Sequence, residues 1–192
     1  MRGPHRFLFI SSLSVLVFCS FVPYKDKHYV DYFLHRYAAD LYHQKQFNLD
    51  YLRVYYGWKT IDRIYFEFSC FRSLSLKEAR ALLIETANGI VEKINKDPLL
   101  NEKDMLPGGH FCIKQLNLEI TAENIFARTT DDSGSIKVVS LEDGVITYET
   151  YNSSVFMPKD RKIFREDYRD AELLVSREKG KGIGFEIEDQ LE

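Results

Sequence analysis

The sequence predicts an α+β domain in which an antiparallel sheet of about five strands packs against two or three helices, preceded by an N-terminal hydrophobic helix. Amphipathic helical segments alternate with strand segments joined by hairpin-length links, and no strand–helix–strand unit repeats along the chain. Aromatic residues make up 14% of the 192 residues, with 12 Tyr and 14 Phe, which is typical of a core that contains a sheet.

Composition and charge exclude several classes of protein. Hydrophobic residues at 45% and charged residues at 29% are close to the globular average, which excludes a disordered, collagen-like or multi-span membrane protein. With a formal net charge of −3, the chain lacks the excess of positive charge that binding to double-stranded nucleic acid requires, so we expect no nucleic-acid partner. Three Cys are too few for a disulfide framework. Phosphate-loop, dinucleotide-binding and zinc-protease motifs do not occur, so no cofactor and no metal site is predicted.

The N-terminus carries an export signal. Arg2 and Arg6 precede an uncharged apolar run from Phe7 to Val22. At about 1.5 Å per residue this run covers roughly 24 Å, a little less than the ~30 Å hydrocarbon core of a bilayer. Because no small-residue pair marks a cleavage site, we predict an uncleaved signal-anchor over 1–24 that holds a single-pass protein in the membrane, with its domain outside the cytoplasm. The alternative is a cleaved signal peptide and a secreted or periplasmic product.

The first part of the domain, which spans 25–180, is predicted to be a helix followed by a hairpin. Apolar residues recur at three-to-four spacing from Lys25 to about Phe47, which indicates an amphipathic helix. Two strands follow, over 49–56 and 61–71, with a link short enough for an antiparallel hairpin. The second strand alternates, and its predicted core face consists of Ile64, Phe66, Phe68 and Cys70.

A second helix and a third strand are predicted in the middle of the chain. Ser75 and Glu78 fit the capping-box pattern, so a helix begins there, and Asp97-Pro98 ends it. The connection over 98–111 is predicted to be loop. Beyond it, apolar and polar residues alternate as in a strand, with Leu116, Leu118 and Ile120 on the core side.

A hairpin and a last helix complete the predicted domain. Asp143-Gly144 is the strongest hairpin signal, because a type I′ turn needs positive φ at both central residues. Asp160 fits the cap of a helix that runs to about Lys179, with Gly180 as its stop. The remaining residues, 181–192, are predicted to form an acidic flexible tail.

The segment SLSLKEARALL over 73–83, with the rest of its helix and the Leu-alternating strand after it, resembles an uncharacterised family of small bacterial exported or membrane-anchored proteins. The resemblance covers mainly 61–150. It brings no known activity, and the matching motif is a helix cap, so it implies no functional residue.

Two cysteines and a histidine are the candidates for thiol chemistry. His110 and Cys112 are two residues apart in an extended stretch, so their side chains are expected to point the same way, as a nucleophile and its base would. Strand parity also places Cys112 with the core residues of the third strand, which favours a buried structural cysteine. If the strand ends that carry Cys70 and Cys112 are neighbours outside the cytoplasm, a disulfide between them is expected.

The outward face of the first hairpin is the candidate binding surface. Its residues are those that protein interfaces favour, since Tyr and Arg give a large contact area with a polar group at the end. The alternative is that they stabilise the strand pair or lie beneath another helix of the domain. The candidate residues are Tyr51, Arg53, Tyr55, Arg63, Tyr65 and Glu67.

These features together predict a membrane-tethered or exported, non-enzymatic domain that binds a protein or peptide partner. The alternative is a thiol-dependent hydrolase or transferase that uses Cys112 and His110. The sequence carries no signal for an oligomeric state.

Overall fold

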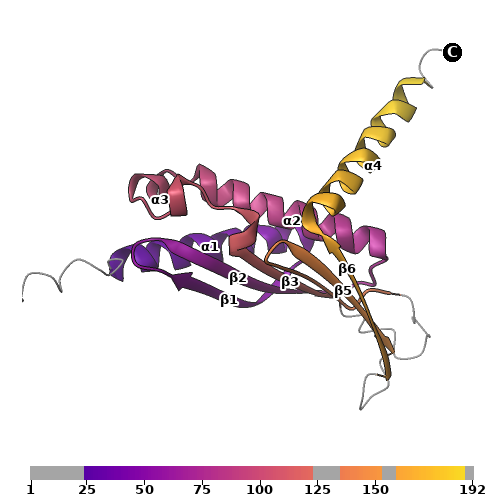
Figure 1. Ribbon diagram of the computed structural model, residues 1–192, viewed down its shortest axis with the longest axis horizontal. Helices are drawn as coiled ribbons and strands as arrows, with labels where there is room; N and C mark the ends of the chain where they lie inside the picture. Colours follow the sequence, from indigo (N-terminus) through magenta and orange to yellow (C-terminus); the bar gives the residue numbers. More distant parts are fainter. Residues whose placement is uncertain (1–23, 123–134, 153–158, 189–192) are drawn as a thin grey trace, which may run out of the picture.

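Two long helices, α1 (Tyr24–Lys45) and α2 (Leu76–Lys96), lie on one face of a six-stranded sheet (Figure 1). The structure is a computed structural model that describes residues 24–122, 135–152 and 159–188. It confirms the α+β class. The hydrophobic segment from Phe7 to Val22 lies outside the described residues. Among the helices that are described, none combines the length and the apolar character needed to cross a bilayer.

The sheet is mixed, which corrects the prediction of a purely antiparallel sheet with about five strands. β2 and β3 run parallel because α2 crosses back over the sheet between them, whereas the other described pairs are antiparallel. A single strand–helix–strand unit leaves no repeat in the sequence, so its pairing could not be recognised there. The strands lie in chain order: β1 (Asn48–Tyr56), β2 (Ile61–Cys70), β3 (Leu116–Ala122), β4 (Val138–Glu142), β5 (Val145–Asn152) and β6 (Lys159–Asp167).

The two helices at the centre of the fold form where amphipathic spacing predicts them. They are α1 (Tyr24–Lys45) and α2 (Leu76–Lys96). α2 begins with the predicted capping box, in which the Ser75 hydroxyl accepts from the Glu78 N–H and the Glu78 carboxylate accepts from the Ser75 N–H. Asp97 ends α2 and also caps α3 (Pro98–Glu102), a short helix in the segment predicted to be loop. The residues that α1 buries are Val30, Leu34, Ala38 and Leu41.

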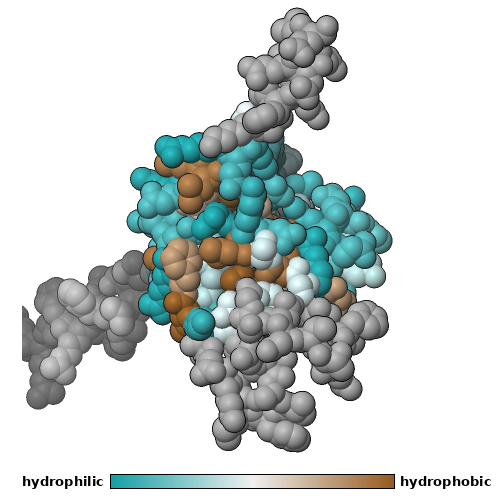
Figure 2. Space-filling model, turned by 90° about the vertical axis from the view of Figure 1, so that its right-hand side faces the viewer, coloured by the Kyte–Doolittle hydropathy of each residue, from teal (hydrophilic) through white to brown (hydrophobic). Residues whose placement is uncertain are grey.

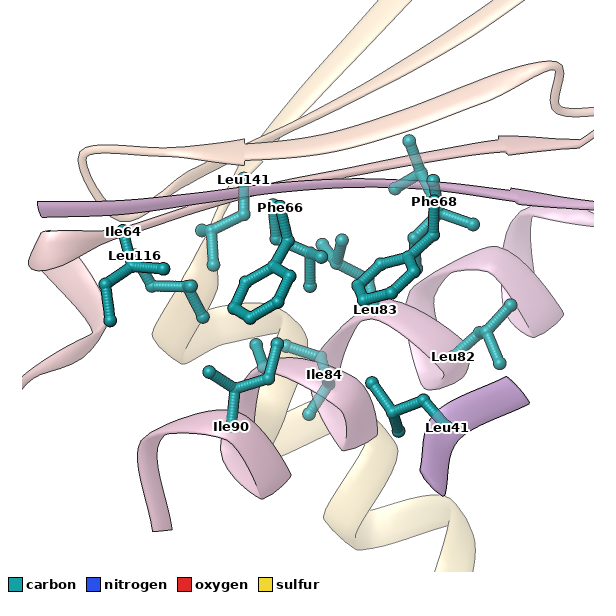
Figure 3. Close-up of a cluster of buried hydrophobic side chains, with 14 of the residues drawn as sticks. Leu41, Ile64, Phe66, Phe68, Leu82, Leu83, Ile84, Ile90, Leu116 and Leu141 are labelled. Atoms are coloured by element: carbon teal, nitrogen blue, oxygen red, sulfur yellow. The ribbon is translucent and has the colours of Figure 1, made fainter. Parts of the chain in front are cut away.

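The core fills the space between the sheet and these helices. Figure 3 shows Phe66 and Phe68 pointing from β2 toward the helical layer, where Leu83 and Ile90 of α2 and Leu41 of α1 meet them. The two Phe rings stack with their centroids 5.4 Å apart, and both side chains are fully buried. The predicted alternation of β2 and β3 is confirmed, because the inward residues are all buried: Ile64, Phe66, Phe68, Cys70, Leu116, Leu118 and Ile120.

The C-terminal part of the chain corrects another prediction, the helix expected to begin at Asp160. That segment is β6, and α4 (Tyr168–Glu188) begins only after it. Asp167 accepts a hydrogen bond from the Arg169 backbone N–H at 2.8 Å, so Asp167 supplies the cap that was predicted at Asp160. β6 is an edge strand, and its backbone is held extended by hydrogen bonds to β5. Such a strand does not need alternating apolar residues, so the sequence of this segment carried no strand pattern.

α4 continues through Gly180, the predicted stop, so residues 181–188 of the predicted tail are helical. The helix packs its first turns on α2, burying Tyr168, Ala171 and Val175, and then projects from the body of the domain (Figure 1). Figure 2 shows brown apolar patches within a mainly teal surface on the side where β6 and α4 lie. Among the side chains of β6 and α4 whose burial is described, 162–167 and 168–180, the large exposed apolar ones are Ile163, Phe164, Leu173 and Leu174.

The hairpin predicted at Asp143-Gly144 is confirmed. The two residues have φ values of 51° and 81°, and Glu142 pairs with Val145 across the turn. Asp143 therefore lies at the exposed end of the β4–β5 pair, where its carboxylate reaches Arg63 of β2, two strands from β4.

Candidate functional site

The structure brings the six candidate binding residues together in three cross-strand rows. We call this surface the Tyr/Arg face; it belongs to the β1–β2 hairpin. The antiparallel register places the partners directly opposite one another, so the prediction that they share one face is confirmed. The three rows are Tyr51 with Glu67, Arg53 with Tyr65, and Tyr55 with Arg63.

No helix within the described ranges covers the Tyr/Arg face, because the long helices lie on the opposite face of the sheet (Figure 1). The side chains of Tyr51 and Tyr55 are each 44% exposed, and Arg53 is exposed as well. Arg63, Tyr65 and Glu67 are half-buried, since β2 has a neighbour on each side whereas β1 is an edge strand. The alternative that a helix of the same domain covers this face is not what the structure shows.

Contacts within the Tyr/Arg face hold its side chains in place. The rings of Tyr51 and Tyr65 meet edge to face with centroids 5.7 Å apart. The Arg53 guanidinium lies over the Tyr55 ring, 4.8 Å from its centroid. Arg63 donates to the Asp143 carboxylate at 2.7 Å, which ties the hairpin to the β4–β5 turn.

Carboxylates border the Tyr/Arg face on the side toward β3, away from the edge strand β1. Glu119 of β3 lies directly beside Glu67 in the parallel β2–β3 register. Burial, together with Glu67 and Glu149, raises the pKa of Glu119 above its ordinary range. Burial and the carboxylates of Glu119 and Glu67 likewise raise the pKa of Tyr65 to about 12. The face thus combines one exposed cation, Arg53, and exposed aromatic rings on β1 with a negative border on β2 and β3.

Glu119 is the residue of this surface that the sequence analysis did not select. Its alternation with Leu118 and Ile120 already indicated that it points outward. Its closeness to Glu67 depends on the parallel pairing of β2 with β3, which no local pattern in the sequence indicates.

The two described cysteines lie far apart, and both are free. Cys70 pairs with Ala122 at one end of the β2–β3 pair, whereas Cys112 precedes the other end, where Ile64 pairs with Leu116. Six residues of strand, about 20 Å at ~3.3 Å each, separate these ends, and a disulfide needs Cα atoms within about 7 Å. The predicted disulfide does not form, because its condition of neighbouring strand ends is not met.

Cys112 is exposed, which corrects its assignment to the core. The strand begins only at Leu116, and η2 (Ile113–Gln115), a single 3₁₀ turn, interrupts the parity between Cys112 and the buried residues of β3. The Cys112 backbone N–H donates to the Gln115 side chain at 2.9 Å, which holds this turn. His110 is also exposed. Within the described segments, no hydrogen bond or ion pair joins the side chains of Cys112 and His110 to each other.

No protein-family model, no curated protein and no solved structure matches this chain. The resemblance over 73–83 therefore stays a prediction. In the part of the chain that the structure describes, no group of three His, Cys, Asp or Glu side chains is placed to hold a metal ion. The Tyr/Arg face is the surface on which the structure gathers the predicted binding residues.

Proposed function

We propose that this protein is a membrane-tethered or exported, non-enzymatic domain that binds a protein or peptide partner through its Tyr/Arg face. The observation that supports this most is the set of three cross-strand rows on a sheet face that no described helix covers. Tyr and Arg are enriched among the residues that dominate binding energy in protein interfaces.

The contacts within the face favour binding in a further way. Arg53 is stacked on Tyr55, and Tyr51 is packed against Tyr65, so these side chains are already ordered before a partner arrives. Ordering long side chains costs about 0.5–1.5 kcal/mol each on association, and a pre-ordered surface avoids part of that cost. An exposed, pre-ordered row of side chains that no described helix covers suits a macromolecular partner better than a small substrate, which needs a concave site.

Site-specific photocrosslinking tests this proposal. A benzophenone amino acid replaces Tyr55 in the full-length chain, in its native compartment, and Tyr42 in a matched control that is 47% exposed on α1. We expect an adduct with one defined polypeptide from position 55 and none from position 42. Equal adducts from both positions, or no adduct from position 55, contradict the proposal. Adducts with the protein itself alone would assign the face to self-association.

The double variant Tyr55→Ala, Arg63→Ala tests the same face by loss of function. Because these two residues form one cross-strand row, the variant removes a ring and a cation together. We expect capture of the crosslinked partner to fall at least about tenfold, as truncation of two central interface residues does. Tyr42→Ala, Arg177→Ala is the matched control, with both residues exposed on helices. Unchanged capture of the partner by the Tyr55→Ala, Arg63→Ala variant would contradict the proposal.

The tether is tested by the intact mass of the protein combined with membrane fractionation. Full mass in the membrane pellet supports the signal-anchor from Phe7 to Val22. A soluble product that has lost the N-terminal segment supports the exported alternative instead. Full-mass protein in the soluble fraction contradicts both.

A thiol-dependent hydrolase or transferase is the second candidate, and the exposure of Cys112 is the observation that favours it. Such an enzyme needs an accessible thiol with a base nearby, for which His110 is the nearest histidine in sequence. Cys112→Ser tests it: a variant that retains every phenotype of the parent protein removes this candidate.

A further inference from the structure

A groove of about 460 Å³ lies between α1 and α2, in the helical layer and thus apart from the Tyr/Arg face. Its volume is within the range of about 300–1,000 Å³ that small-molecule sites occupy. The lining is divided by chemistry: aromatic rings from α1, cations from both helices, and Asp97-Pro98 at the C-terminal end of α2.

Two tyrosines form the floor of the groove by bridging the helices. The Tyr29 hydroxyl donates to the Asp97 carboxylate at 2.8 Å. The Tyr37 hydroxyl lies against Gly89, where an added Cβ would be only 2.8 Å from the oxygen. Gly89 therefore allows this close approach, which accounts for a residue that otherwise weakens a helix interior. Phe33 stacks on Tyr29 with centroids 6.3 Å apart, so the floor is aromatic and ordered.

The rim of the groove carries positive charge that the described protein does not neutralise. Arg36 of α1 and Lys93 of α2 line it, and within the described segments neither forms a hydrogen bond or an ion pair. Lys96 is paired with Glu92.

Two carboxylates also line the groove, and neither is paired with these two cations. Asp97 accepts hydrogen bonds from the N–H groups of Leu99 and Leu100 and from the Tyr29 hydroxyl, so its oxygens are occupied by neutral donors. Asp40 is the other acidic residue of the lining. Within the described residues, the donor groups of Arg36 and Lys93 therefore stay open beside an aromatic floor.

We propose that the α1–α2 groove binds a small aromatic monocarboxylate, with its ring on the floor formed by Tyr29, Phe33 and Tyr37 and its carboxylate between Arg36 and Lys93. A carboxylate can accept hydrogen bonds from the open donor groups of Arg36 and Lys93, and a planar ring matches the aromatic floor. Tyr32, which is 65% exposed on the same helix, is placed at the mouth to cover the bound ring.

Two probes of nearly the same shape and different charge test this site, 2-naphthoate and the neutral 2-naphthamide. Each is titrated into the full-length protein with ring-labelled tyrosine, and the tyrosine signals are followed by NMR. We expect saturable shifts of Tyr32 and Tyr37 with the carboxylate, at an affinity about tenfold or more above that of the amide, because a charged hydrogen bond is lost in the amide. Equal affinity for the two probes, or no saturable shift with 2-naphthoate, overturns the proposal.

Charge variants keep the test specific to the groove. Arg36→Gln, Lys93→Gln is expected to lower the 2-naphthoate affinity about tenfold or more and to leave the weak binding of the amide unchanged. Arg169→Gln, Lys59→Gln is the matched control, since both of its residues are exposed and lie outside the lining. Loss of 2-naphthoate binding in the control pair, or its retention in the groove pair, contradicts the assignment. Neither result depends on the Tyr/Arg face.

Discussion

The Arg80–Glu166 pair ties α2 to the edge of the sheet, and it is the most buried ion pair among the described residues. Two guanidinium nitrogens of Arg80 donate to the two carboxylate oxygens of Glu166 at 2.7 and 3.1 Å, and their side chains are only 15% and 11% exposed. The Tyr148 hydroxyl also donates to Glu166, and burial together with this carboxylate raises the tyrosine's pKa. The carboxylate thus depends on both donors for its stability in the interior.

Removal of Arg80 is therefore expected to be costly. Arg80→Leu leaves a buried carboxylate without its cation, so we expect the free energy of unfolding in urea to fall by about 3 kcal/mol. Adding Glu166→Leu should restore part of this loss, because no unpaired charge then remains. Lys77→Leu is the control on the same helix. Its ion pair with Glu178 is largely exposed, and its loss should cost less than about 1 kcal/mol. Equal losses in Arg80→Leu and Lys77→Leu would contradict this explanation.

Single residues also show which parts of the candidate sites could be predicted from the sequence and which could not. The shared face of Tyr51, Arg53 and Tyr55 follows from strand alternation alone, because side chains two residues apart always point the same way. The same rule failed for Cys112, since the 3₁₀ turn after it shifts the parity. The α1–α2 groove was not predicted, because it depends on the distance between two helices that are far apart in the sequence.

At the scale of an element, local signals predicted the start of α2 correctly. The pattern at Ser75 and Glu78 specifies a helix start through contacts within four residues, so no tertiary information is needed. The predicted start of the last helix was wrong, because Asp160 and Asp167 are both suitable N-cap residues and Asp167 is the one that caps α4. Only the pairing of β6 with β5 decides between them.

Ser75→Ala is expected to weaken α2 by removing its cap. We expect a loss of about 1 kcal/mol in the free energy of unfolding at neutral pH, measured by urea denaturation. Hydrogen bonds from Ser75 lower the pKa of Glu78 below its ordinary value of 4.5. The contribution of this carboxylate is therefore present above pH 4.5 and is lost as the pH falls through its lower folded value.

The difference between wild type and Ser75→Ala should accordingly shrink in acid. Ser176→Ala, an exposed serine within α4, is the control for the loss of a hydroxyl alone, and its effect should not depend on pH. A Ser75→Ala deficit that is the same at pH 3 and pH 7 would show that the carboxylate takes no part in the cap.

At the scale of the whole molecule, the parallel pairing of β2 and β3 determines what the cysteines can do. An antiparallel pairing would have brought Cys70 and Cys112 toward the same end of the sheet, as the disulfide required. The observed crossover separates them and leaves one thiol buried and the other exposed. Burial also raises the pKa of the Cys70 thiol, which lowers its reactivity further.

The rate of thiol labelling measures how accessible Cys70 and Cys112 are in the folded protein. In a Cys19→Ser background, we expect an aromatic disulfide reagent to label Cys112 at once and Cys70 only as fast as the molecule unfolds. Urea should then release the second thiol along the same transition that circular dichroism follows. Adding Cys112→Ser should abolish the rapid phase alone. Two rapid phases, or none, would contradict the burial assigned to the two cysteines.

The crossover has a kinetic consequence as well. The β1–β2 hairpin and the β4–β5 hairpin can each close through a short turn, and their neighbours in the sheet follow in chain order. β2 and β3 can pair only after the whole stretch from Phe71 to Gln115 has closed into a loop. Closing this loop costs conformational entropy before any contact between the two strands has formed. We therefore expect the rate of folding to be set at the β2–β3 seam, where the docking of α2 joins two halves of the sheet that can form locally.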